Sequence, residues 1–386
     1  MRSPKAPILL ALGIAALLAS CGKREPDPVV VGLNLELTGD IQMIGKSAKN
    51  AAELFFAQLN EAGGIELADG KRRLEITASD NAANATQAAA IAQQQISREN
   101  IVAMIGPNSG KCATSASDIA EALKCVMISP WSADPMTTTD PVAGVPKRYV
   151  FRAGATDALQ GRVMAEFAAK KLGARRAAVI ADSAQGATQA AGFRQAFAAA
   201  GGEVVAEEVF EAFGKDFPRQ VGSVASASPD VVFVAAPCED ALDILEAAKA
   251  AGLNSKFLGT ELWNSPQTIR MTALGIDGLY FCRNFDHRDA DPQTAKFVEE
   301  YTAKYNTPPD DVAALTYDAC GLIAAALKKS GKNEREALRE SLAQISGYEG
   351  VAGSYNFEPG SGDPAKSMPV LQIKSSGLEW IGDFGN

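Results

Sequence analysis

Side chains that could carry out acid–base, nucleophilic or metal chemistry are scarce in this sequence. Its 386 residues contain one histidine, His287, in the acidic polar stretch 286–289, which we expect to form a surface loop. Zinc sites and activated serine or cysteine nucleophiles usually depend on histidine. The motifs G-x-S-x-G, G-x-x-x-x-G-K-[ST], G-x-G-x-x-G, H-E-x-x-H and C-x-x-C do not occur. We therefore expect a protein that is not an enzyme and holds neither metal nor cofactor.

The six cysteines divide into one near the N-terminus and five further along the chain. The five are Cys112, Cys125, Cys238, Cys282 and Cys320. An odd number permits at most two disulfides, and the sequence does not specify a pairing. Cys112 and Cys125 flank a predicted helix, which would separate them by more than the roughly 7 Å that a bridge tolerates. We interpret the five as small buried residues with at most one bridge.

The N-terminus has the pattern of an export signal. Arg2 and Lys5 precede the apolar run 8–18, which is too short to span a bilayer, and small residues lead into Cys21. A cysteine directly after L-A-S resembles a bacterial lipobox, in which that cysteine is diacylated and becomes the first mature residue. The alternative is an ordinary cleaved signal in which Cys21 is incidental. We predict a signal peptide over 1–20, lipidation of Cys21, and a polar tether over 21–28.

The composition indicates a globular chain with two domains. Hydrophobic residues make up 47% and charged residues 22% of the sequence, and the formal net charge is −9. An acidic protein does not offer a nucleic-acid surface. After the signal, no apolar run approaches the roughly 20 residues that a membrane helix needs. The expected location is the periplasm or the cell surface, with a lipid anchor in a bacterial membrane.

Short apolar runs alternate with helical patterns in the first third of the chain. This βαβ series predicts a parallel sheet covered on both faces. The predicted strands cover 29–35, 74–78, 101–105, 126–128 and 149–152, and the predicted helices cover 45–60, 84–97 and 112–123.

The same α/β design begins again after residue 152. The predicted helices cover 158–172, 187–200, 217–225 and 239–250, and the strands cover 177–181, 203–209, 231–235, 257–259 and 278–282. Helices over 292–305, 311–329 and 334–345 and β-like segments over 354–357 and 369–373 follow. The last helices have no sheet of their own, so we expect them to pack on an earlier lobe, which requires more than one crossing between lobes.

Ordered motifs along the mature chain carry a family resemblance. They are VGLNLELTG at 31–39, LNEAGGI at 59–65, DN at 80–81, IGP at 105–107, MISP at 127–130, FR at 151–152, AAG at 250–252, FLG at 257–259 and YDA at 317–319. In this order the chain resembles the periplasmic branched-chain amino-acid (leucine/isoleucine/valine) binding proteins of ABC importers. The family has the type I periplasmic binding fold.

The resemblance implies a clamshell with two Rossmann-like lobes, each with a parallel sheet, joined by three crossing strands. It places residues 29–150 and 284–354 in the first lobe and residues 151–283 and 355–386 in the second. A small solute would bind between the lobes, where strand carboxyl ends and helix N-termini meet. Closure around the solute would present a shape that membrane permease subunits recognise.

In the first lobe, the resemblance assigns ligand contacts to two loops, the first over residues 108–111 and the second over residues 131–134. The family holds the ligand carboxylate with a hydroxyl and backbone amides. Its usual serine and threonine fall on Gly110 and Ala133, each preceded by a serine, so the hydroxyl role moves to Ser109 and Ser132. Both serines could instead be caps of the following segments. Lys111 would favour an acidic ligand if it faced the cleft, and would have no such role if it faced solvent.

In the second lobe, the resemblance makes Glu261 the partner of a ligand ammonium. Glu261 follows the apolar strand 257–259, where a buried carboxylate needs a partner. The family's two tyrosine contacts are missing, and Gln185, with Asp182 upstream, and Pro237 stand in these regions. Trp131 and Trp263 could line an apolar wall for a larger side chain or could pack within the lobes.

The expected function is capture of a branched-chain, other apolar or aromatic amino acid by a monomeric lipoprotein that serves an ABC importer. Two alternatives with the same fold remain. One is a ligand-sensing receptor subunit, and the other is a binder of short amides, urea or acidic amino acids. Loss of a need for Glu261 would mark an amide binder.

Overall fold

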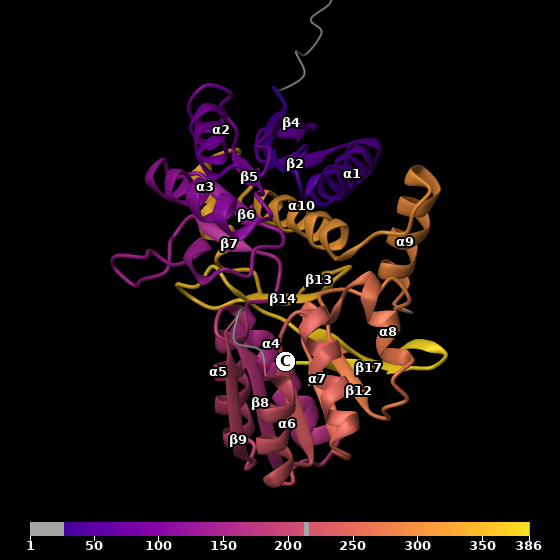
Figure 1. Cartoon of the computed structure of the whole chain (residues 1–386). Coiled ribbons are helices and arrows are strands. Elements are labelled where there is room, and N and C mark those ends of the chain that lie inside the picture. The colour runs from indigo at the N-terminus through magenta and orange to yellow at the C-terminus, as the bar shows by residue number, and fades with distance from the viewer. Residues whose placement is uncertain (1–26, 212–215, 290, 386) are drawn as a thin grey trace, which may run out of the picture.

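Two α/β lobes form the protein in its computed structural model, which describes residues 27–211, 216–289 and 291–385. In Figure 1 the purple elements and the orange helix α10 (Asp311–Ser330) lie in the upper lobe, while the elements coloured from magenta to salmon form most of the lower lobe. Yellow strands lie between the lobes and along the lower one. The predicted signal peptide, Cys21 and the tether up to residue 26 lie outside the described residues. Across the described ranges, no helix is both long and apolar enough to cross a membrane.

The first lobe is built around a five-stranded parallel sheet with the order β4-β1-β5-β6-β7. Its strands are β1 (Val29–Leu35), β4 (Leu74–Asp80), β5 (Ala103–Ile105), β6 (Val126–Ser129) and β7 (Val150–Arg152). The helices after β1, β4 and β5 are α1 (Gln42–Glu61), α2 (Ala85–Ser97) and α3 (Gly110–Ala122). A hairpin of β2 (Ile65–Leu67) and β3 (Gly70–Arg72), which the sequence pattern did not predict, follows α1.

Helices cover both faces of this sheet, as the βαβ pattern predicts. Ala103 and Ile105 of β5 belong to a core cluster that also contains residues of α1, while Met104 between them belongs to a cluster with α2 and α3. Successive side chains of a strand point to opposite faces. A strand buried on both faces is therefore apolar at every position.

The second lobe contains a seven-stranded sheet with the order β17-β16-β12-β11-β10-β8-β9. Its parallel strands are β8 (Arg176–Asp182), β9 (Glu203–Phe210), β10 (Val231–Ala235), β11 (Lys256–Gly259) and β12 (Leu279–Cys282). On one face lie α4 (Asp157–Glu166), which continues as a π-helical turn (Phe167–Lys171), and α5 (Gln185–Ala199). On the other lie α6 (Phe217–Ser226), α7 (Cys238–Ala250) and α8 (Ile269–Thr272).

At one edge this parallel sheet carries two antiparallel strands, whose direction the sequence pattern did not predict. Strands β16 (Met368–Lys374) and β17 (Gly377–Phe384) add to it in antiparallel orientation. The reason is the route of the chain. Strand β12 ends at the junction between the lobes and β16 begins there, so the two neighbours run in opposite directions.

The chain passes between the lobes three times. The passages lie between β7 and α4, between β12 and α9 (Pro292–Tyr305), and between β14 (Gly353–Phe357) and β16. Strand β14 pairs with β13 (Tyr348–Gly350) and β15 (Pro364–Ala365) in a small sheet at the junction (Figure 1). At Gly362 a Cβ would lie 2.0 Å from the Val150 carbonyl oxygen, so the first and last passages touch through their backbones.

The C-terminal helices pack on the first lobe, as the sequence predicts. Helix α10 (Asp311–Ser330) contacts α1, and α11 (Arg335–Leu342) contacts α10. Their apolar side chains belong to the same core cluster as β1. The interpretation of the cysteines is also confirmed, because all five described cysteines are buried and free. His287 is exposed in a turn, as expected.

Two helices of the second lobe approach through glycine. A Cβ on Gly161 of α4 would lie 1.9 Å from the Gln189 carbonyl oxygen of α5, whereas a Cβ on Gly222 of α6 would meet no atom within 4 Å. We therefore expect Gly161→Ala to lower the free energy of unfolding by roughly 1–3 kcal/mol through overpacking. The matched substitution Gly222→Ala should raise it by about 0.5–1 kcal/mol, because alanine restricts the unfolded chain. Urea unfolding of both variants measures the difference, and equal effects would contradict the close helix contact.

Candidate functional site

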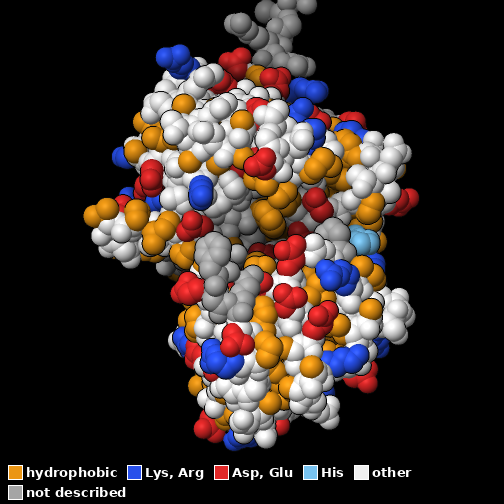
Figure 2. All heavy atoms as spheres, in the orientation of Figure 1, with side chains coloured by type: hydrophobic (Ala, Val, Ile, Leu, Met, Phe, Trp, Pro, Cys, Tyr) orange, Lys and Arg blue, Asp and Glu red, His pale blue; other side chains and the backbone are white. Residues whose placement is uncertain are grey.

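The carboxyl ends of the parallel strands in both lobes face the junction. There a cavity of about 150 Å³ opens between the lobes, and Figure 2 shows acidic side chains around this hollow. The cavity is lined by Ile44, Trp131, Glu261, Asn264, Asp310, Asp311 and Val312. Ligands of open α/β sheets bind beyond the strand ends, so this cavity is the candidate site.

Glu261 reaches the cavity because the chain turns sharply after β11. It begins a short 3-10 helix (Glu261–Trp263), and Thr260 caps that helix by accepting a hydrogen bond from the Leu262 amide. A Cβ on Gly259 would lie 2.1 Å from the Trp263 ring. Glycine thus allows the indole to fold back over the strand end, and the turn leaves Glu261 at the cleft.

Two amide side chains hold Glu261 in place. Its carboxylate accepts a hydrogen bond from Asn284 Nδ2, and Asn284 Oδ1 accepts one from the Ala155 amide at 2.9 Å. The Glu261 backbone amide donates to Gln160 Oε1 at 3.3 Å. Asn284 follows β12 and Ala155 precedes α4, so two passages between the lobes meet at this carboxylate.

The surroundings of Glu261 favour its neutral form. Burial, followed by the negative charges of Asp311 and Asp157, raises the pKa of Glu261 to about 8. Asp311 is itself paired with Arg283. Asp157 accepts hydrogen bonds from Gln185 and Gln189 at 2.8 and 2.9 Å. Because its direct side-chain partner is an amide, a cation placed in the cavity would favour the ionised form of Glu261.

The first-lobe loops differ from the expectation in how their serines are used. Ser109 precedes α3, but its side chain makes no capping hydrogen bond. The backbone amides of Asn108 and Ser109 both donate to the fully buried Glu36 carboxylate at 3.1 Å. The chain's own carboxylate therefore already occupies the first amides at this helix N-terminus. Glu36 follows an apolar strand as Glu261 does, and that pattern was the available signal for it.

The second loop supports a structural role for its serine. Ser132 is buried, and its Oγ lies 2.8 Å from Thr137 Oγ1 within the same loop. Gly110 lies against this loop, since a Cβ there would be 3.1 Å from Asp134 Cβ. Ala133 is half-buried beside it, whereas Lys111 is exposed on α3, which fits the alternative that it faces solvent.

The two tryptophans have different surroundings. Trp131 is half-buried and lines the cavity. Trp263 is fully buried in the core of the second lobe, among residues of α7 and β12. The suggestion that Trp263 lines the cleft is therefore corrected to its alternative, packing within the lobe. The ring fills the space that Gly259 leaves open.

The other second-lobe candidates lie around the strand ends without lining the cavity. Asp182 accepts hydrogen bonds from the Ala184 and Gly186 amides, which places it at the start of α5. Gln185 donates to Asp157, and Pro237 is exposed just before α7. No cluster that could hold a metal ion occurs among the described residues.

Sequence reasoning missed the helix starts that complete the cavity. Ile44 lies in the first turn of α1, and Asp310 caps α10 by accepting a hydrogen bond from the Ala313 amide at 2.8 Å. A cap was recognisable from the aspartates before an apolar helical run. The sequence pattern did not show that α10 returns to face Glu261 across the cleft.

Comparison with known proteins agrees with this geometry. The family model described as periplasmic binding protein matches residues 28–378. The leucine-, isoleucine-, valine-, threonine-, and alanine-binding protein of Pseudomonas aeruginosa is 25% identical over 335 residues, covering 86% of each chain. The Leu/Ile/Val-binding protein of Escherichia coli K12 is 26% identical over 328 residues, covering 84% of this chain and 86% of the relative.

Solved structures show the same architecture. The leucine binding protein LivK of Thermotoga maritima aligns with a TM-score of 0.70 at 26% identity, covering 92% of this chain and 99% of that one. LivJ of Streptococcus pneumoniae, solved in complex with isoleucine, aligns with a TM-score of 0.68 at 25% identity over the same shares. With a family match across nearly all of its described residues and a cleft between two α/β lobes, this chain belongs to the periplasmic binding protein family.

Proposed function

We propose that the protein captures an apolar amino acid, branched-chain or aromatic, between its lobes and delivers it to an ABC importer. The observation that carries the proposal is the half-buried Glu261 carboxylate, which lines the cavity with an amide, not a cation, as its direct partner. A ligand ammonium would supply the missing positive charge. Ile44, Trp131 and Val312 give the same cavity an apolar wall.

The ligand carboxylate would lie on the first-lobe side of the cleft. Glu36 already binds the amides of Asn108 and Ser109, so the next amides at the start of α3 and the Ala133 amide of the Trp131 loop (residues 131–138) remain for it. The N-terminal amides of a helix have no partner within the helix and favour an anion. The names of the relatives above, which bind leucine, isoleucine and valine, support an amino-acid ligand.

The lobes, the anchor and the partners follow from this binding function. We assign residues 29–150 and 284–354 to the first lobe and residues 151–283 and 355–386 to the second. Removal of residues 1–20 and lipidation of Cys21 would anchor the monomer outside the cytoplasm. Its partners would be the permease subunits of the importer, and its activity would be binding without turnover.

Calorimetric titration of the protein, unfolded and refolded to remove carried-over ligand, tests the ligand class. We expect leucine or phenylalanine to bind, and Glu261→Gln to weaken binding roughly 10- to 150-fold, because a hydrogen bond to a charged group contributes about 1.5–3 kcal/mol. Glu239→Gln, the same change on an exposed residue of α7, should have no effect. Binding of glutamate or a short amide alone, or binding unaffected by Glu261→Gln, would refute the assignment.

The raised pKa of Glu261 gives the binding a pH dependence. Because its pKa is about 8 in the ligand-free protein, ammonium binding below pH 8 must release the proton. Affinity should therefore rise from pH 6 to pH 8, by up to about tenfold per pH unit, and then level off. Titrations in buffers of different ionisation enthalpy count the released protons, and Glu261→Gln should release none.

The raised pKa of Glu261 also predicts how the stability of the ligand-free protein depends on pH. A carboxyl with a raised pKa binds its proton more tightly when folded, so its contribution is present at low pH and is lost as pH rises towards 8. As pH rises towards 8, the melting temperature of Glu261→Gln should therefore fall less than that of the unmodified protein. Identical dependence of melting temperature on pH in the two proteins would contradict the raised pKa of Glu261.

The cavity wall makes Trp131 a determinant of apolar ligands. Trp131→Ala should weaken leucine or phenylalanine binding by at least about tenfold, because it removes a large aromatic surface from the cavity. Trp380, which is 47% exposed on β17, provides the control, and Trp380→Ala should bind as the unmodified protein does. Equal affinities of the two variants would exclude a ligand contact for Trp131.

A further inference from the structure

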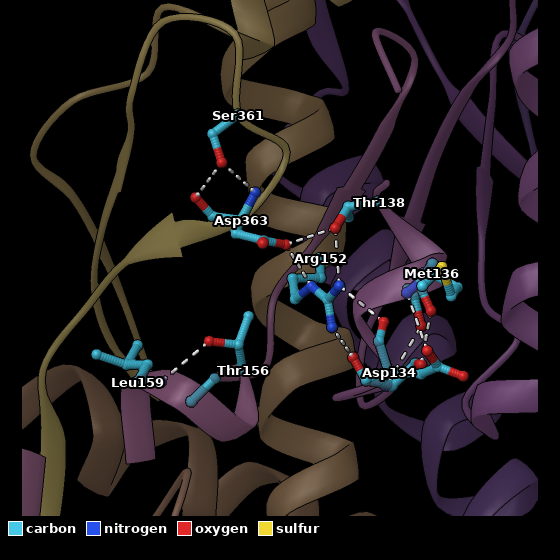
Figure 3. A network of polar contacts seen from close by, with 12 residues as sticks. Asp134, Met136, Thr138, Arg152, Thr156, Leu159, Ser361 and Asp363 are labelled. Carbon is cyan, nitrogen blue, oxygen red and sulfur yellow. Dashed lines mark hydrogen bonds and ion pairs between the residues drawn. The ribbon is translucent and has the colours of Figure 1, made fainter. Parts of the chain in front are cut away.

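Arg152, the last residue of β7, is a fully buried charged side chain between the two lobes. Its Nε donates to Asp363 Oδ1 at 2.5 Å, and its Nη2 donates to Thr138 Oγ1 at 2.8 Å. Thr138 Oγ1 in turn donates to Asp363 Oδ1 at 2.8 Å, as Figure 3 shows. One guanidinium thus connects the first passage between the lobes with the last.

The remaining hydrogen bonds of Arg152 go to the backbone of the Trp131 loop. Nη1 donates to the Ser132 carbonyl at 2.6 Å. Nη2 donates to the Asp134 carbonyl at 2.9 Å (Figure 3). A planar guanidinium can hold several acceptors in one fixed geometry, which a lysine ammonium cannot reproduce. Arg152 therefore sets the orientation of two peptide groups in this loop.

Holding the Ser132 carbonyl also fixes the next backbone amide. In a trans peptide the C=O of one residue and the N–H of the next point in opposite directions. The Ala133 N–H consequently points away from Arg152. Among the described residues the Ala133 N–H has no hydrogen-bond acceptor. Trp131, two residues earlier in the same loop, lines the cavity.

We propose that Arg152 is a positioning residue for ligand binding, which aims the free Ala133 amide at the ligand carboxylate and ties that loop to the passages between the lobes. This inference rests on the proposed amino-acid function. Arg152 touches no ligand itself. Its effect on affinity comes through the loop backbone, and its bond to Asp363 keeps the loop in register with the last passage.

Arg152→Lys tests the proposal in the refolded full mature chain. We expect affinity for leucine to fall at least tenfold and amide hydrogen exchange over 131–138 to become faster in the ligand-free protein. Leucinol, which lacks the carboxylate, should lose much less affinity, so the preference for leucine over leucinol should shrink. A merely structural role would weaken both ligands equally.

Arg335→Lys is the matched control, because Arg335, the first residue of α11, also donates to two backbone carbonyls, those of Ile101 and Ile96, outside the Trp131 loop. It should change neither the leucine preference nor exchange over 131–138. If Arg152→Lys does not fold, Asp363→Asn, which removes the charged partner and keeps Arg152, should show the same pattern with a smaller loss.

The outcomes separate this inference from the proposed function. Failure of the unmodified protein to bind leucine or phenylalanine would remove the function, while exchange over 131–138 would still report whether Arg152 holds the loop. An unchanged leucine preference in a folded variant, or unchanged loop exchange, would overturn the positioning role.

Discussion

The burial of charged side chains where the chain passes between the lobes is the constraint on which this structure depends. Arg152, Arg283 and Lys366 are each more than nine-tenths buried at or near these passages. An unpaired charge there would cost several kcal/mol. Arg152 pairs with Asp363 and Arg283 with Asp311, and Lys366 lies by the Tyr355 ring and hydroxyl. Asp363 and Asp311 lie far in the sequence from the arginines with which they pair, so these ion pairs connect separate segments at the junction.

Unlike the two arginines, Glu261 has no oppositely charged direct partner among the described residues, and the proposed function rests on this difference. It lies among the same passages, yet Asn284 is its direct partner, and burial with two neighbouring carboxylates raises its pKa to about 8. An incoming cation would stabilise the ionised form of this carboxylate. Its protonation and the occupation of the cleft are therefore linked. The contrast with Glu36, whose carboxylate is satisfied by backbone amides, shows that burial alone does not create such a site.

Much of the fold could be predicted because both faces of each parallel sheet are buried. That burial makes strands such as β5 and β10 apolar at every position, and it separates them from helices with a longer repeat. The hairpin β2/β3 was missed because its three-residue strands are too short to show a period. The direction of β16 could not be predicted, since direction depends on where the chain re-enters a lobe and not on local pattern, and β17 was missed altogether.

For the site, the sequence alone determined the residues that follow apolar strands and the extent of the helix over 311–329, because these signals are local. It placed Glu261 and Trp131 near strand ends, where loops of an α/β sheet converge. Only the tertiary structure decided that α10 returns to set Asp311 and Val312 opposite Glu261, and that Trp263, unlike Trp131, is buried in the core. The physical reason is that such neighbours are chosen by packing between segments far apart in the chain, and no local pattern records which surfaces will meet.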